Sequence, residues 1–162
     1  MPELVEPMVE DARWEAAGFP PLAERAARAA LTAVGRDPDL HEVSLLLCDD
    51  ARMAELNSQF RGKPQPTNVL SWPSYDGDMP EPPGNPGEGP LFVGDIALGY
   101  ETCAREAAEA GIPLADHATH LVVHGLLHLV GFDHAEDDEA EAMEALETKI
   151  LASLGVANPY SG

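Results

Sequence analysis

Residues 124–134 read HGLLHLVGFDH and place three histidines at the spacing His-x3-His-x5-His. Residues four apart lie one above the other on a helix, so His124 and His128 can point two imidazoles at the same spot. Gly131 can adopt the left-handed conformation that commonly ends a helix, which would let the chain return and bring in His134. Three neutral nitrogens with an open fourth position are typical of a catalytic zinc site, whereas a structural site has four ligands. The stretch therefore predicts one zinc ion per chain, bound by His124, His128 and His134.

The segment that carries the first two histidines predicts a buried helix. Pro113 stands at a preferred first-turn position, and residues 114–130 are apolar on nearly every side, which is typical of a core helix. A core helix is a rigid support for metal ligands. His117 and His120 fall on the same side as His124. We interpret them as supporting or cleft residues, with direct coordination of the metal as the alternative.

Periodicity along the rest of the chain predicts one domain that spans residues 1–162. Short apolar or alternating runs indicate strands, and apolar positions at helical spacing indicate helices. Pro7 restricts the first strand to an edge of the sheet. We expect strands at residues 4–9, 41–48, 69–72 and 91–98, helices at residues 21–34, 101–110 and 114–130, a helix from Asp49 or Asp50 through Phe60, and a last helix after His134 that Gly155 ends.

Two further segments have clear composition. Residues 74–90 are dense in proline and glycine and predict a flexible surface loop, whose length leaves open whether it acts as a lid. In the last helix, one apolar stripe predicts the buried face, and the acidic residues between its members predict the solvated face. The stripe consists of Met143, Leu146, Ile150, Leu151 and Leu154.

Composition limits the location and the partners of the protein. Nine Lys and Arg residues against 29 Asp and Glu residues give a net charge of −20, which disfavours generic attraction to nucleic acid or anionic membranes. Two cysteines, Cys48 and Cys103, are too few for a disulfide framework or a cysteine metal site. The N-terminus has no signal-peptide pattern, and no window approaches the roughly 18 apolar residues of a membrane span. We expect a cytoplasmic protein.

Three charged residues outside the histidine stretch are candidates for the site. Arg61 and Lys63 follow a helix end in a loop rich in Gly and Pro, where they could bind a phosphate or simply complement the helix dipole. Asp95 interrupts an apolar strand after Gly94. It is a candidate acceptor for the N–H of a ligand histidine, or else a strand-end aspartate that faces water.

The histidine pattern limits the chemistry. It matches the zinc-protease pattern His-Glu-x-x-His-x-x-Gly-x-x-His except that Gly125 stands where the general-base glutamate would be. Proteases of that class deprotonate a water through this glutamate, so peptide hydrolysis by that route is disfavoured. A metal can also polarise a phosphoryl oxygen, and cleavage of a phosphodiester would suit Arg61 as a phosphate ligand.

Four stretches together resemble the YbeY family of bacterial endoribonucleases and rRNA maturation factors. The family typically reads His-Gly-x-Leu-His-Leu-x-Gly-(Tyr or Phe)-Asp-His, as residues 124–134 do, and the likeness extends over roughly residues 42–160. The other three matching stretches are FRGKPQPTNVLSW at 60–72, FVGDIAL at 92–98 and HAEDDEAEAMEALETKIL at 134–151. The resemblance implies an α+β fold, a small mixed sheet of about four strands flanked by helices, with the zinc-ligand helix in the core.

The resemblance also implies a function. It assigns the zinc ligands to His124, His128 and His134, and it makes Arg61 functionally important. It implies a metal-dependent nuclease for single-stranded RNA that acts in 16S rRNA 3′-end maturation and ribosome quality control, with a ribosomal protein or GTPase as partner. Asp133 and His120 are the candidates for proton transfer.

Two other functions remain open at this point. A zinc-stabilised ribosome assembly factor without catalysis would use the metal only to hold the turn at Gly131. It would unfold on loss of a ligand and cut no RNA when it is loaded with metal. A zinc hydrolase of another ester or amide would turn over small substrates independently of Arg61.

Overall fold

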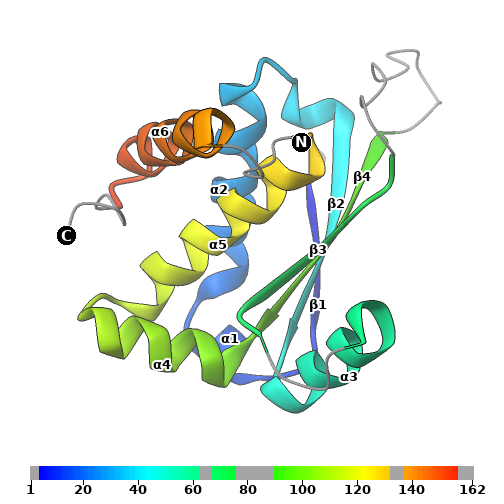
Figure 1. Ribbon diagram of the computed structural model, residues 1–162, viewed down its shortest axis with the longest axis vertical. Helices are drawn as coiled ribbons and strands as arrows, with labels where there is room; N and C mark the ends of the chain where they lie inside the picture. Colours follow the sequence, from blue (N-terminus) through cyan, green and yellow to red (C-terminus); the bar gives the residue numbers. More distant parts are fainter. Residues whose placement is uncertain (1–3, 63–66, 76–89, 132–136, 157–162) are drawn as a thin grey trace.

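The computed structural model is built around a four-stranded mixed sheet with the strand order β1-β2-β4-β3 (Figure 1). The structure describes residues 4–62, 67–75, 90–131 and 137–156. Strand β1 pairs in parallel with β2, β2 pairs in parallel with β4, and β3 runs antiparallel to β4. The strands are β1 (Val5–Val9), β2 (His41–Cys48), β3 (Val69–Pro73) and β4 (Leu91–Gly99).

Alternation along the strands sends side chains to two different faces. Along β2, the side chains of Val43, Leu45 and Leu47 are buried in the main core, whereas Ser44 and Leu46 point to the other face and are partly exposed. Successive residues of a strand point to opposite faces, so this pattern defines a helix-covered face and a more open face.

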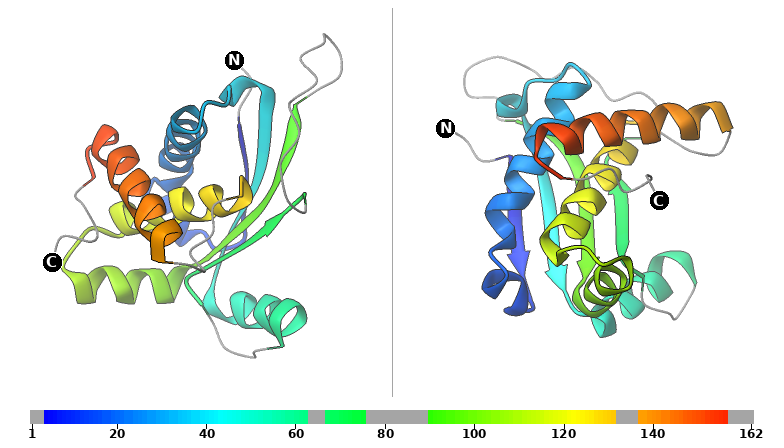
Figure 2. Two further views of the ribbon diagram at one scale, coloured as in Figure 1. Left: turned by 45° about the horizontal axis from the view of Figure 1, so that its top comes forward. Right: turned by 90° about the vertical axis from the view of Figure 1, so that its left-hand side faces the viewer.

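Most helices cover one face of the sheet (Figure 2). The main core joins that face to α2 and α5, and α4 and α6 pack against α5. The helices are α1 (Arg13–Ala16), α2 (Phe19–Ala33), α3 (Asp50–Arg61), α4 (Tyr100–Ala110), α5 (Leu114–Leu129) and α6 (Asp137–Ser153), with a short 3-10 turn η1 (Pro38–Leu40).

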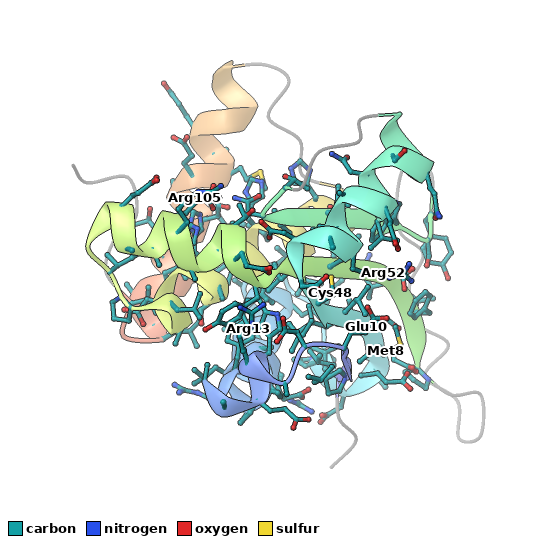
Figure 3. All side chains as sticks on the ribbon, turned by 90° about the horizontal axis from the view of Figure 1, so that it is seen from below. Met8, Glu10, Arg13, Cys48, Arg52 and Arg105 are labelled. Carbon is teal, nitrogen blue, oxygen red and sulfur yellow. The ribbon has the colours of Figure 1, made fainter. Side chains whose placement is uncertain are left out.

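Helix α3 lies on the open face, at one end of the sheet. Its residues Met53 and Leu56 pack with Cys48, Leu70 and Ala97 in a second, smaller apolar cluster. Near this end of the sheet, Arg52 pairs with Glu10 just after β1, with 3.4 Å between Nε and Oε1 (Figure 3). The rest of the open face is left without a covering helix among the described residues.

The structure confirms the α+β class and most of the predicted elements. Strand β2 has the predicted bounds, and β1 is an edge strand, as Pro7 indicated. Helix α3 begins after Asp49, whose side chain accepts a hydrogen bond from the N–H of Arg52. Helix α2 begins two residues earlier than predicted, with Pro20 in its first turn. Most of the predicted loop at 74–90 lies outside the described residues.

Gly94 marks a bulge in β4. The register between β2 and β4 shifts there, so that Phe92 faces Glu42 and Gly94 faces Val43, which leaves Val93 as the extra residue. Gly94 has φ 151°, and a Cβ at this position would lie 2.4 Å from the carbonyl oxygen of Trp72. The close approach of β3 therefore requires glycine here.

No helix in the described ranges is long and apolar enough to cross a membrane.

Candidate metal centre

Four histidines follow one another along one side of α5. The ring centroids are 6.4 Å apart for His117 and His120, 6.3 Å for His120 and His124, and 4.8 Å for His124 and His128. The last two rings are nearly perpendicular, at 80°. One helical turn thus brings His124 and His128 together, as their spacing predicted.

His124 and His128 line a cleft of about 390 Å³ between α5 and the edge strand β3. The histidines stand on one wall, and polar groups stand on the other. The lining residues are Thr67, Asn68, Val69, Ser71, Pro73, His124, Gly125 and His128. A concave site with a few convergent polar groups is the usual setting of a small-ligand or substrate site.

A buried carboxylate lies behind the first of these histidines. Glu147 of α6 is 0% exposed, and its Oε1 lies 2.6 Å from Nδ1 of His124. The same oxygen lies 3.6 Å from Nε2 of His120. Glu147 was not among the residues predicted for the site, and the prediction that the acidic residues of this helix face solvent is wrong for Glu147, although it holds for Glu141 and Glu144. The signal was present, since Glu147 lies four residues after Met143 and three before Ile150, within the apolar stripe.

Gly125 lies where α5 packs on the sheet. A Cβ at this position would lie 3.4 to 3.5 Å from side-chain carbons of Ile96 on β4. This is ordinary van der Waals contact, so the position has room for a methyl group but is bounded by the sheet. The residue that replaces the protease glutamate therefore serves the contact between helix and sheet.

His117 belongs to a separate polar link. Its Nε2 lies 2.9 Å from Oε1 of Glu106 on α4, and the same oxygen accepts a hydrogen bond from Nδ2 of Asn68 at 3.0 Å. Glu106 thereby ties α5 to the wall of the cleft that Asn68 lines. We interpret His117 as a supporting residue of the cleft.

Residues 9–155 match the family model described as Endoribonuclease YbeY. The chain belongs to the YbeY family. Curated relatives called Endoribonuclease YbeY include a protein of Ruegeria pomeroyi that is 54% identical over 94% of this chain and 95% of its own length. A relative from Cereibacter sphaeroides is 53% identical over 99% of this chain and 100% of its own length.

The structural comparison agrees with the fold. A solution structure of a Thermotoga maritima protein aligns with a TM-score of 0.58 at 21% sequence identity, over 98% of this chain and 99% of that protein. At this identity the likeness concerns the fold, which the two proteins share.

Several residues that the YbeY resemblance singled out lie at the limits of the described structure. The backbone of Arg61 forms the last residue of α3, but its side chain is outside the described residues, as are Lys63, Asp133 and His134. Within the described part, no three His, Cys, Asp or Glu side chains form a metal-binding group. Gly131, just after α5, has φ 109°, so the predicted glycine turn is present.

Among the described residues, Asp95 lies apart from His124 and His128. Asp95 lies opposite Trp72 on the open face of the sheet and lines a different cavity, of about 330 Å³, with Met8 and Leu46. Partial desolvation of the Asp95 carboxylate raises its pKa. Strand alternation after the bulge directs Asp95 away from the histidines of α5. The role of Asp95 as an acceptor for a ligand histidine stays a prediction, because His134 lies outside the described residues. The carboxylate that does contact Nδ1 of His124 is that of Glu147.

Proposed function

We propose that this YbeY-family chain is a zinc-dependent endoribonuclease that cuts single-stranded RNA in 16S rRNA 3′-end maturation and ribosome quality control. The proposal rests mainly on the pair His124 and His128. Their ring centroids are 4.8 Å apart, and both side chains line a cleft that also has polar residues. Cleavage of rRNA in such a role takes place in the cytoplasm. The polarity and the shape of the cleft suit a phosphodiester more than an apolar ester.

The donor set fits zinc. Imidazole nitrogens are preferred zinc ligands, and a carboxylate behind a ligand histidine is a common companion of such sites. His124, His128 and His134 would hold one zinc ion per chain, with Gly131 providing the turn between the last two. A bound zinc ion supplies Lewis acidity toward a phosphate oxygen.

The residues around the pair suit RNA. Arg61 ends α3, and the chain is next described at Thr67 and Asn68, which line the cleft. In our proposal Arg61, assisted by Lys63, binds a phosphate beside the metal ligands through paired hydrogen bonds. The side chains of Thr67, Asn68 and Ser71 can hydrogen-bond to phosphate oxygens and to the 2′-hydroxyl.

Two residues are candidates for moving a proton. Nε2 of His120 lies 3.6 Å from Oε1 of Glu147, and His120 is not among the described residues that line the cleft. Asp133 directly precedes the proposed ligand His134 in sequence. This difference favours Asp133 as the group that holds or transfers the proton.

The net charge of the protein bears on how RNA reaches the cleft. A net charge of −20 repels free RNA at long range, so we propose that the small ribosomal subunit presents the rRNA, with a ribosomal protein or GTPase as the docking partner.

The test compares wild type, Arg61→Ala and Arg25→Ala on an RNA that spans the 3′ end of precursor 16S rRNA, free and within small subunits. Arg25 is exposed on α2, so its loss is a matched change of charge away from the cleft. All three proteins are first shown to be folded and loaded with zinc. We expect wild type and Arg25→Ala to cut and Arg61→Ala to lose about 100-fold or more in rate, as when a stabilising donor is removed.

The other outcomes decide between the alternatives. Equal cutting by all three proteins would mean that Arg61 has no part in the reaction. Failure of the zinc-loaded wild type to cut, even within subunits, would favour the assembly factor without catalysis. Turnover of small esters that does not depend on Arg61 would favour the other hydrolase.

A further inference from the structure

We propose that Glu147 is a positioning residue of the metal site: from α6, it holds His124 in the tautomer that keeps a lone pair on Nε2 for the metal. The inference rests on the metal site proposed above. It concerns a residue outside the histidine stretch, 23 positions along the chain from His124.

Burial of this carboxylate calls for compensation. Glu147 is 0% exposed, whereas Glu141 and Glu144 on the same helix are exposed. A buried carboxylate is costly unless it is paired and hydrogen-bonded. The short 2.6 Å contact with Nδ1 of His124 provides such a partner. Glu147 therefore contacts α5 and does not contribute to the charged surface of the protein.

Two histidines of α5 lie near the Glu147 carboxylate, and apolar packing fixes the helix that carries it. Oε1 of Glu147 lies 2.6 Å from His124 and 3.6 Å from Nε2 of His120, one turn earlier on α5. On α6, the side chains of Met143, Ile150 and Leu151 are buried in the main core and fix the helix around Glu147. The contact between α5 and α6 thus includes a polar centre enclosed by apolar packing.

The geometry selects one tautomer. An ionised carboxylate can only accept a hydrogen bond, so in our proposal the proton of this contact lies on Nδ1 of His124. A neutral imidazole with its proton on Nδ1 keeps its lone pair on Nε2, and a metal ligand must present a lone pair. Glu147 also restrains rotation of the ring, which keeps it beside His128 in the cleft.

The first test is zinc affinity. Glu147→Gln keeps the size of the side chain but removes its charge and adds a donor that can support the other tautomer. Glu144→Gln makes the same chemical change at an exposed position of the same helix. Zinc dissociation constants are measured by chelator competition, and the melting temperature of each zinc-free protein is measured in parallel.

We expect Glu147→Gln to bind zinc about 10- to 100-fold more weakly than wild type, and Glu144→Gln to match wild type. Equal zinc affinity of the two variants would overturn the proposal, whatever their melting temperatures. Failure of wild type itself to bind zinc would instead overturn the proposed metal site, so the two failures are distinguishable.

A second measurement needs no variant and covers the case in which Glu147→Gln does not fold. Long-range nitrogen–proton NMR correlations of zinc-free wild type report which ring nitrogen of His124 carries the proton. We expect the proton on Nδ1. A proton on Nε2 would show that Glu147 does not set the tautomer and would overturn the inference.

Discussion

The histidines of α5 share one side of the helix but meet different neighbours. His117 contacts Glu106, which is tied to the cleft wall through Asn68. His124 contacts Glu147 and lines the cleft together with His128. Identical side chains at regular spacing thus meet different surroundings: His117 contacts Glu106 of α4, whereas the proposed ligand His124 contacts Glu147 of α6.

At this scale we predict different effects of two matched substitutions. His128→Ala should weaken zinc binding by about 100-fold or more, since losing a direct ligand should cost at least as much as losing its hydrogen-bond partner. His117→Ala should leave zinc binding within a few-fold of wild type. Metal content after dialysis against a weak chelator checks both. Equal zinc loss in the two variants would argue against the assignment of His128.

At the scale of elements, two glycines near the contact between α5 and the sheet have different surroundings. Gly94 lies in the bulge of β4, where a Cβ would meet the carbonyl oxygen of Trp72 at 2.4 Å. Gly125 lies on α5, where a Cβ would be in ordinary contact with Ile96, at 3.4 Å or more. The first position excludes a side chain, whereas the second has room for a methyl group.

We therefore predict opposite effects of two glycine-to-alanine substitutions. Gly94→Ala should lower the free energy of unfolding by about 2 kcal/mol or more, because it combines a backbone clash with an unfavourable φ. Gly125→Ala should leave the free energy of unfolding unchanged or raise it by up to about 1 kcal/mol, because alanine favours the helix. Urea denaturation measures both. A Gly94→Ala protein as stable as wild type would contradict the described bulge.

At the scale of the whole molecule, charge and burial set how the protein meets solutes. Nine cationic side chains oppose 29 acidic ones, so the surface as a whole repels polyanions. Both cysteines are fully buried, Cys48 between the sheet and α3 and Cys103 on α4. RNA must therefore be bound locally, and the thiols are shielded from reagents.

The charge distribution predicts a shallow salt dependence of RNA binding. If Arg61 and Lys63 supply the phosphate contacts, the logarithm of the association constant should fall with the logarithm of salt concentration with a slope of about −1.4 for single-stranded RNA. Fluorescence anisotropy with a short labelled RNA measures this slope. A slope of about −4 or steeper would indicate roughly six phosphate contacts and a much larger basic surface than we propose.

Because the two thiols are buried, we predict that the free energy of unfolding falls at alkaline pH. Burial raises the pKa of Cys48 from 9.0 to about 12 and also raises that of Cys103. Because folding favours the protonated thiols, their contribution to stability is complete below pH 9 and is lost as the pH rises toward 12.

Burial of the thiols also predicts slow chemical labelling. At pH 8, iodoacetamide should label both thiols only as fast as the protein unfolds. Rapid labelling of the native protein would contradict this burial.

Much of the fold could be predicted because it depends on local periodicity. Residues within a few positions of one another determine three of its features: the bounds of β2, the helix cap at Asp49 and the turn at Gly131. The juxtaposition of His124 and His128 has the same origin, since a single turn of helix provides it. These features require no knowledge of the neighbouring elements.

Tertiary packing decided what lies behind and opposite the histidines. Glu147 reaches His124 from another helix, and whether an acidic residue faces water or a partner depends on how the two helices pack. Asp95 faces away because a bulge and strand pairing determine the face of the sheet. The cleft itself exists because β3 forms the edge beside α5. Periodicity determines which residues share a side of an element, but only long-range contacts determine what that side meets.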